Sequence, residues 1–224
     1  MSGILYGVGV GPGNPELMTL KAARIIREAD VIAVPGMEIA ESAAYRIAVQ
    51  AVPELAGKEK IAIPMPMTHD REEMERRHAE GAERIKMFLG EGRNLAFLTL
   101  GDPAVYSTFF YLQKRVAADG FRTETVSGVP SFCAAAAEAG IPLVEGRESL
   151  HIVPAAHGIG DEILEGTCIY MKAGRKLGAI RKRALAEGKT AVMVENCGME
   201  GERICRGAEE MPEEAGYYTL VVVR

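Results

Sequence analysis

The chain has 224 residues, 48% of them hydrophobic and 25% charged, with a formal net charge of −5. This composition indicates one large or two small globular domains and excludes a chain-wide basic field for nucleic acid, although a local basic patch stays possible. The apolar runs are too short to span a membrane, and the N-terminal MSGILYGVGV lacks the basic residues of a secretory signal. Four widely spaced cysteines without a C-x-x-C pair favour reduced thiols in a cytoplasm over a disulfide framework or a metal site.

Strands and helices alternate along the first half of the chain. Apolar, β-branched runs predict strands at residues 4–10, 31–34, 61–64, 94–100 and 123–126. Helical periodicity and end signals predict helices at residues 16–29, 41–52, 70–89, 107–118 and 130–139. This alternation predicts an α/β fold with a largely parallel sheet.

The second half has a different pattern. Strands are predicted at residues 150–153, 167–171, 190–195 and 217–223, with one clear helix at 178–187. Too few helices separate these strands for a purely parallel sheet, so we expect a mixed sheet. The predicted organisation is an N-terminal α/β lobe over residues 1–128 and a C-terminal α/β lobe over residues 129–224.

The stretch GVGVGPGNPELMTL at residues 7–20 is typical of a ligand-binding loop, but it fits neither common phosphate motif. In the dinucleotide pattern G-x-G-x-x-G, the third glycine falls on Pro12 or Asn14, and no P-loop pattern is present. Asn14 is predicted to cap the following helix, with Pro15 at its first position, which leaves little room for an anion. By itself the loop fits either a tight turn or a site for a ligand without phosphate.

Two further loops follow predicted strands, in the stretches LGDPAVYSTF and SGVPSF. Ligands of open parallel sheets bind beyond the carboxyl ends of the strands, so these loops and the first one can share a site. Asp102 is then either a side chain of that site or a turn residue that caps its own loop.

Together these motifs resemble those of the tetrapyrrole methylases, which use S-adenosylmethionine. The resemblance rests on GVGPGNPELMTLKA, LGDPAVYSTF, SGVPSF, AGIPL, YMKAG and VENCG, in that order along nearly the whole chain. It implies a two-lobed fold with the cofactor in the cleft between the lobes, and a homodimer. GDPAVYSTF and PMPMT are most similar to the branch that methylates C-20 of precorrin-2 or cobalt-factor II in cobalamin synthesis.

The resemblance also implies cofactor contacts at the matching positions. Many relatives carry a hydroxyl residue where this chain has Pro130, so a side-chain hydrogen bond is lost there, and whether Ser131 replaces it stays open. Cys197 would act through its backbone, since many relatives have glycine at that position. The implied cofactor-binding residues are Pro12, Leu100, Gly101, Asp102, Val105, Pro130, Ser131, Met171 and Cys197.

Methyl transfer from a sulfonium to carbon is an in-line displacement that needs alignment of donor and acceptor rather than a metal or a covalent nucleophile. A meso carbon loses a proton as it is methylated, so a general base can contribute. Asp102, Tyr106 and His69 are the candidates, and each has an alternative interpretation as a turn, packing or loop residue. The electron-rich substrate can also react with positioning alone.

Basic residues gather at positions 172–183, and there they either bind carboxylates of the substrate or form a solvated helix face. They are Lys172, Arg175, Lys176, Arg181, Lys182 and Arg183. Four functional alternatives stay open: methylation at another ring position, methylation of diphthine or RNA, a nucleotide-dependent oxidoreductase, and a non-catalytic binding module. The acidic net charge argues against RNA, and the failed dinucleotide pattern argues against the oxidoreductase.

Overall fold

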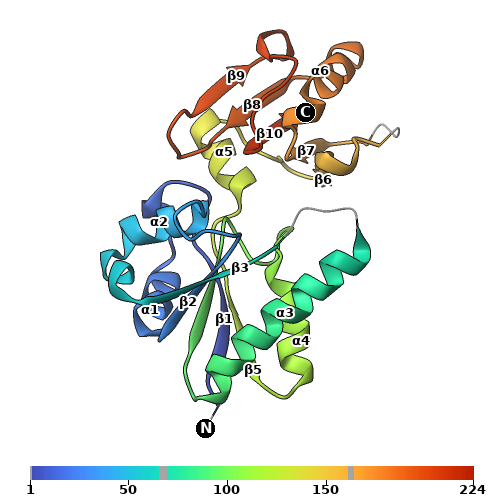
Figure 1. Ribbon diagram of the computed structural model, residues 1–224. Coiled ribbons are helices and arrows are strands. Elements are labelled where there is room, and N and C mark those ends of the chain that lie inside the picture. The colour runs from blue at the N-terminus through green and yellow to red at the C-terminus, as the bar shows by residue number, and fades with distance from the viewer. Residues whose placement is uncertain (1, 66–69, 161–163) are drawn as a thin grey trace. The chain divides into compact units, whose positions relative to one another are not determined.

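The computed structural model describes residues 2–65, 70–160 and 164–224 (Figure 1). The chain divides into two compact units, Met1–Pro130 and Ser131–Arg224. This division falls close to the lobe boundary expected after residue 128, and that the two lobes are separate domains stays a prediction.

The N-terminal unit is built on a five-stranded sheet in the order β3-β2-β4-β1-β5, and every pair of neighbours is parallel, as predicted. Both faces of the sheet are covered, because alternate strand residues enter two separate apolar clusters. Leu5 and Phe97 pack into one cluster, whereas Val8 and Leu98 pack into the other. The strands are β1 (Ile4–Gly9), β2 (Val31–Pro35), β3 (Glu59–Ile63), β4 (Leu95–Thr99) and β5 (Arg122–Val126), and the helices are α1 (Leu20–Glu28), α2 (Ala43–Ala51), α3 (Arg71–Gly90) and α4 (Phe109–Ala118).

The first helix starts later than predicted. Asn14 caps a single 3-10 turn, η1 (Pro15–Leu17), by accepting a hydrogen bond from the Glu16 backbone N–H at 2.9 Å. The chain is extended at Met18, and Thr19 caps α1 by accepting a hydrogen bond from the Ala22 N–H. The predicted continuous helix over 16–29 is therefore wrong in its first turn, because a second N-cap residue restarts the helix. The sequence also predicts an apolar stripe through Leu17, Leu20, Ala23 and Ile26, and this prediction is wrong at Leu20, which is 92% exposed.

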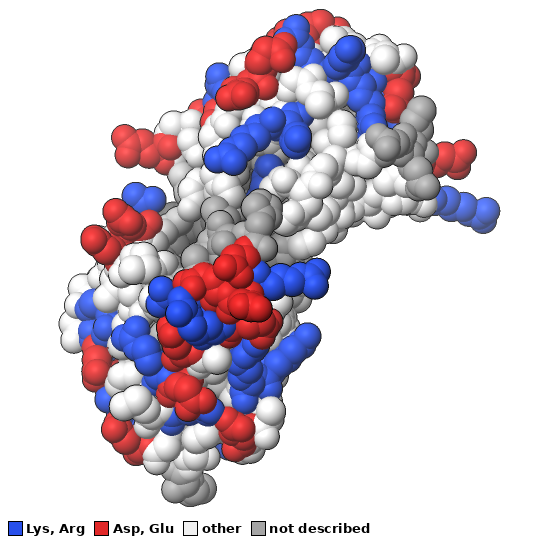
Figure 2. All heavy atoms as spheres, turned by 45° about the vertical axis from the view of Figure 1, so that its right-hand side comes forward, with Lys and Arg blue, Asp and Glu red and all other residues white. Residues whose placement is uncertain are grey.

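Helix α3 carries a dense mixture of charges on its exposed side, visible as interspersed blue and red over the N-terminal unit in Figure 2. Its side chains form ion pairs at helical spacing, such as Arg77 with Glu73 at 2.9 Å and with Glu80 at 3.2 Å. Because these groups are exposed to solvent, such pairs add little to the stability of the fold. The run REEMERRHAEGAER at residues 71–84, whose mixed charges indicate a solvated helix face, does form one.

His78 lies on the buried side of α3, where its ring stacks on Tyr111 with centroids 4.7 Å apart. Its Nδ1 has no hydrogen-bond partner among the described residues. Burial, assisted by the charge of Arg115 and opposed by Glu75, holds the pKa of the His78 imidazole below its ordinary value. The neutral ring is therefore the form that the folded state favours.

We expect the protein to lose stability on the acid side through His78. Because its folded-state pKa lies below the unfolded-state value, this contribution is complete above about pH 6.5 and falls as the pH drops further. Urea unfolding midpoints at pH 8 and pH 5.5 measure the loss. His78→Phe keeps a stacked ring without a titrating group and should reduce the difference between the two midpoints. An unchanged difference in the variant would contradict this assignment.

The C-terminal unit holds a mixed sheet in the order β6-β7-β10-β8-β9, with β6 parallel to β7 and the other neighbours antiparallel, as predicted. Strand β9 was not predicted, because its four residues RICR carry charges at both ends and show little apolar signal. The elements are α5 (Ser131–Ala139), β6 (Leu150–Pro154), β7 (Thr167–Met171), α6 (Leu177–Ala186), β8 (Ala191–Glu195), β9 (Arg203–Arg206) and β10 (Thr219–Val223).

In the part of the chain that the structure describes, no helix has both the length and the apolar composition that crossing a bilayer requires. The apolar side chains of α6, β7, β8 and β10 instead form the core of the C-terminal unit, around Tyr170, Leu177 and Val221.

Candidate functional site

Three neighbouring strands of the N-terminal sheet end in the loops singled out by the sequence. β1 lies between β4 and β5, so the glycine loop (residues 10–14), the Asp102 loop (residues 100–107) and the Gly128 loop (residues 127–130) emerge side by side. Backbone hydrogen bonds join the first two: Gly101 N–H donates to the Gly11 carbonyl at 2.8 Å, and Gly11 N–H donates to the Gly101 carbonyl at 3.3 Å. The loops therefore form one connected structure at the carboxyl edge of the sheet.

Glycines allow the three loops to touch through their backbones. A Cβ on Gly9 would lie 2.6 Å from the Gly101 carbonyl oxygen and 2.6 Å from the Gly128 nitrogen. A Cβ on Gly128 would collide with the same carbonyl oxygen. Gly7 has a different role, because a side chain there would collide with the Phe109 ring in the apolar core. Of the glycines in the first motif, Gly9 and Gly11 thus serve the loop cluster and Gly7 serves packing.

Asp102 links two of the loops through its side chain. Its Oδ2 accepts a hydrogen bond from the Gly128 N–H at 2.9 Å, and its Oδ1 accepts one from the Ala104 N–H at 2.7 Å. Hydrogen bonds from backbone N–H groups to a carboxylate are charge-assisted and well directed. Asp102 therefore holds the Gly128 loop against its own loop. Its bond to the Ala104 N–H is the turn role that the sequence left as an alternative.

The chemistry of the loop cluster suits a ligand without phosphate. Residues 9–14, 100–107 and 127–131 contain no Lys or Arg, and Asp102 is the one charged residue among them. The first helical turn is already capped by Asn14, so its N–H groups are not presented to an anion. A cofactor with a positive sulfur and an uncharged nucleoside fits this set of residues better than a nucleotide does.

The structure brings together six of the nine predicted cofactor-binding residues in the N-terminal unit. Pro12 and Gly101 are buried, whereas the side chains at 100, 102, 105 and 130 are partly exposed. Ser131, Met171 and Cys197 belong to the C-terminal unit, and that they join the N-terminal residues in one site stays a prediction.

The two predicted residues Met171 and Cys197 lie at the end of the C-terminal sheet where β7 and β8 finish and β10 begins. β10 lies between β7 and β8, with Leu220 opposite Met171 and Thr219 opposite Glu195. Burial is the main cause that raises the pKa of the Cys197 thiol to about 11, assisted by the charges of Glu202 and Glu138. The thiol is thus neutral near pH 7 and is not an activated nucleophile, which agrees with a backbone role.

Three of the sequence motifs contain backbone strain. Among the described residues other than glycine, positive φ occurs at Tyr106 (49°), Lys172 (55°) and Asn196 (52°). These lie in LGDPAVYSTF, YMKAG and VENCG respectively. A left-handed conformation costs a residue with a side chain about 1–2 kcal/mol, and such residues gather at functional sites. Backbone strain therefore points to the same three motifs as the sequence resemblance does.

The general-base candidates differ in their placement. Both carboxylate oxygens of Asp102 accept backbone hydrogen bonds, and Tyr106 is 48% exposed. His69 lies outside the described residues.

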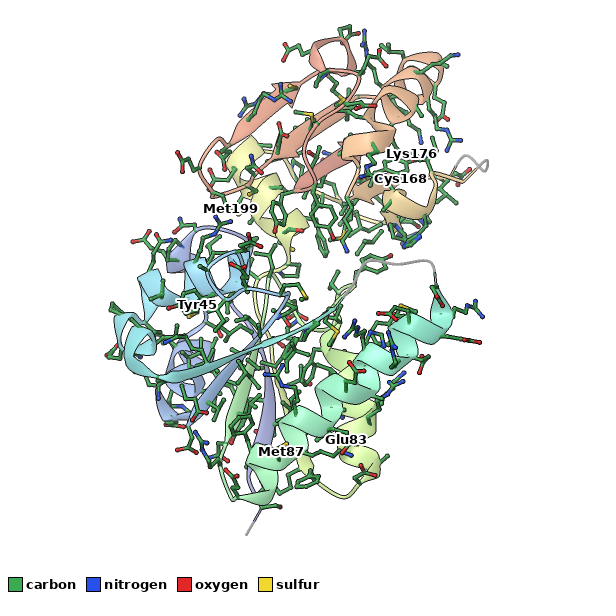
Figure 3. All side chains as sticks on the ribbon, viewed as in Figure 1. Tyr45, Glu83, Met87, Cys168, Lys176 and Met199 are labelled. Atoms are coloured by element: carbon green, nitrogen blue, oxygen red, sulfur yellow. The ribbon has the colours of Figure 1, made fainter. Side chains whose placement is uncertain are left out.

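The basic residues of positions 172–183 fall into two groups, those with a protein partner and those exposed to solvent. Arg181 pairs with Glu213 at 3.1 Å, and Arg183 donates to the carbonyls of Ile159 and Gly160. Figure 3 labels Lys176, which lies at the start of α6. Neither Lys176 nor Arg175 has an ion pair with another described residue, and both are exposed. Part of the group is therefore structural, and part can still meet a ligand.

Comparison with known proteins gives the family of the chain. The model of the family described as Tetrapyrrole (Corrin/Porphyrin) Methylases matches residues 4–212. The chain belongs to the tetrapyrrole methylase family. The family match includes every predicted cofactor-binding residue, from Pro12 to Cys197.

Several members of the tetrapyrrole methylase family resemble the chain over its whole length. The probable cobalt-precorrin-2 C(20)-methyltransferase of Methanocaldococcus jannaschii is 33% identical, over 98% of this chain and 95% of that protein. The precorrin-2 C(20)-methyltransferase of a Sinorhizobium species is 31% identical, over 100% and 97%. The cobalamin biosynthesis protein CobIJ of Mycobacterium tuberculosis is 32% identical over 99% of this chain, which spans only 46% of CobIJ.

The fold of the chain also resembles those of solved tetrapyrrole methylases. Uroporphyrin-III C-methyltransferase of Thermus thermophilus, solved with S-adenosyl homocysteine, superposes with a TM-score of 0.68. It is 24% identical, over 99% of this chain and 97% of that chain, and this likeness shows the fold alone.

Some features of this tetrapyrrole methylase have no clear signal in its sequence. The hydrogen bond from the Gly216 N–H to Glu195, at 2.6 Å, joins residues 21 positions apart, and the loop around Gly216 carries no motif. The sequence also gives no sign that Tyr106 and Lys172 adopt a left-handed conformation, since neither residue type favours it. Asn196 is the exception, because asparagine adopts positive φ more readily than other residues.

Proposed function

We propose that the chain is an S-adenosylmethionine-dependent methyltransferase that methylates C-20 of precorrin-2 or of its cobalt-containing form, cobalt-factor II. The proposal rests first on three cation-free loops at the carboxyl edge of the sheet in a member of this family, which backbone hydrogen bonds and the Asp102 side chain join to one another. The two full-length relatives named as C(20)-methyltransferases support the ring position. The chain spans only 46% of CobIJ, so the match to that larger protein does not by itself assign an activity to this chain.

S-adenosylmethionine supplies an electrophilic methyl group on a sulfonium when it is bound. The chain's contribution is to align and to exclude water, which accounts for roughly 7–11 kcal/mol in well-oriented reactions. We assign the cofactor contacts to the nine predicted residues: Pro12, Leu100, Gly101, Asp102, Val105, Pro130, Ser131, Met171 and Cys197. Because Asp102 already accepts two backbone N–H groups, its effect on the cofactor is to fix the backbone around it.

The proton of the methylated carbon leaves to Asp102, to Tyr106 or to water. Asp102 has the negative charge that a base needs, although its oxygens also hold the loops. Tyr106 is exposed and held in a left-handed conformation, which directs its side chain differently from a relaxed residue. We also propose a homodimer located in the cytoplasm, with the cofactor between the two lobes, as the resemblance implies.

The deciding experiment incubates the protein with S-adenosylmethionine and either precorrin-2 or cobalt-factor II under anaerobic conditions. We expect a gain of one methyl group by mass spectrometry and its location at C-20 by carbon NMR with a labelled methyl donor. The substrate that is methylated faster decides whether cobalt is present in the natural acceptor. A gain at another carbon would place the chain in a different branch of the family. No gain on either substrate would refute the proposed activity.

A further inference from the structure

The loop over residues 213–218 is held firmly against the YMKAG and VENCG motifs. The Glu195 carboxylate accepts a hydrogen bond from the Gly216 N–H at 2.6 Å and pairs with Arg203 at 2.8 Å. The Asn196 N–H donates to the Tyr218 carbonyl at 2.9 Å, and the Ala215 N–H donates to the Gly174 carbonyl at 3.2 Å. A Cβ on Gly174 would collide with the carbonyl oxygens of residues 215 and 216. The loop is thus fixed to the same sheet edge as Met171 and Cys197.

This fixed loop presents two aromatic rings. Tyr217 and Tyr218 are 45% and 39% exposed, and their rings meet edge to face with centroids 5.3 Å apart. The Nζ of Lys172 lies 5.4 Å from the centre of the Tyr217 ring, within the range of a cation–π interaction. Lys172 directly follows Met171, and its φ is 55°. Strain in the backbone therefore accompanies a cation held on an exposed aromatic surface.

Lys172 differs from the other basic residues nearby. Arg181 and Arg183 are occupied by Glu213 and by backbone carbonyls, and Arg175 and Lys176 are exposed. Lys172 is only partly exposed, and among the described residues its contact is with an aromatic ring and not with a carboxylate. Its ammonium is therefore held against a ring and forms no ion pair with a described carboxylate, which leaves it able to pair with an incoming anion.

The geometry points to a contact for the methyl acceptor: we propose that the Lys172 ammonium pairs with a peripheral carboxylate of the tetrapyrrole while the Tyr217 and Tyr218 rings lie against its macrocycle. This inference rests on the proposed function, because a tetrapyrrole with several carboxylates is the acceptor of that reaction. Planar conjugated rings and anionic side chains are the two chemistries that an aromatic pair and a fixed ammonium recognise. Lys172 and the two tyrosines thus affect the binding of the acceptor and not the methyl-transfer step itself.

Lys172→Met tests the contact, since it removes the charge while keeping the length of the side chain and the same unfavourable φ. We expect the KM for the tetrapyrrole to rise roughly tenfold, as for loss of one charge-assisted contact of about 1.4 kcal/mol. The KM for S-adenosylmethionine and the calorimetric affinity for S-adenosyl homocysteine should stay unchanged. Lys172→Arg should recover most of the affinity, and Tyr217→Leu should weaken tetrapyrrole binding while Tyr217→Phe should not. Lys114→Met, on exposed α4 surface, is the matched control for loss of one lysine charge.

An unchanged KM for the tetrapyrrole in Lys172→Met would overturn the inference, and so would an equal rise in both KM values, which would indicate a structural effect. Tetrapyrrole binding is also measured directly, by the change in visible absorption of cobalt-factor II on titration with protein. If the wild type binds this compound without methylating it, the proposed activity fails and the contact is still tested by the variants. If neither the wild type nor the variants bind it, the contact fails together with the acceptor.

Discussion

Asp102→Ala should reduce kcat/KM for methyl transfer by roughly 100-fold, the loss expected when a reacting group is misplaced by about 1 Å. The reason is geometric, because the substitution removes the acceptor of the Gly128 N–H and of the Ala104 N–H at once. The Gly128 loop is then no longer held to the Asp102 loop by a side chain. Steady-state kinetics and calorimetry with S-adenosyl homocysteine measure the two consequences, on turnover and on cofactor affinity.

Asp102→Asn separates the charge of the residue from its geometry. An amide keeps one oxygen acceptor but places an NH₂ group opposite the second backbone N–H, so one link is lost and two donors face each other. We therefore expect an intermediate loss of activity. Asp119→Ala is the control, since Asp119 lies at the end of α4 and pairs with Lys86 on the surface. Wild-type kinetics in Asp102→Ala would contradict the linking role.

Gly128→Ala should destabilise the protein by about 1–3 kcal/mol and abolish most cofactor binding. The new methyl group would collide with the Gly101 carbonyl oxygen and would lie 2.9 Å from the backbone of Gly9. Backbone atoms at these positions cannot move aside as a flexible side chain would, so the loops must separate. Urea unfolding gives the loss of stability, and calorimetry with S-adenosyl homocysteine gives the loss of affinity.

Gly90→Ala is a suitable control for this steric effect. Gly90 ends α3, and a Cβ there would meet no atom within 4 Å. Alanine is favoured over glycine in helices by up to about 1 kcal/mol, so this variant should be neutral or more stable. Equal behaviour of the two variants would show that the close approach at Gly128 has no structural importance.

Much of the fold follows from local patterns in the sequence. Apolar, β-branched runs located β1, β2 and β4, and the helices predicted at residues 41–52 and 70–89 begin close to the observed caps Ser42 and Asp70. The failures are also local in origin. Asn14 and Thr19 are both good N-cap residues, and only packing decides that the first closes a single turn while the second starts α1.

The candidate site is less accessible to sequence reasoning. That three loops meet follows from the strand order β4-β1-β5, which no local pattern encodes. The resemblance named Gly101 and Asp102, but their hydrogen bonds to Gly11 and Gly128 depend on tertiary distances. The same holds for Lys172, whose place on Tyr217 requires two segments 45 residues apart to be neighbours in the sheet.

The backbone contacts among Gly9, Gly101 and Gly128 have a consequence for how such a protein changes over time. A cluster joined through main-chain atoms and one carboxylate depends on few side chains. Neighbouring side chains that take no part in these contacts can therefore be exchanged during evolution without dismantling the cluster. Under the proposed function, new acceptor preferences then arise from substitutions around the cluster, while its backbone framework is inherited intact.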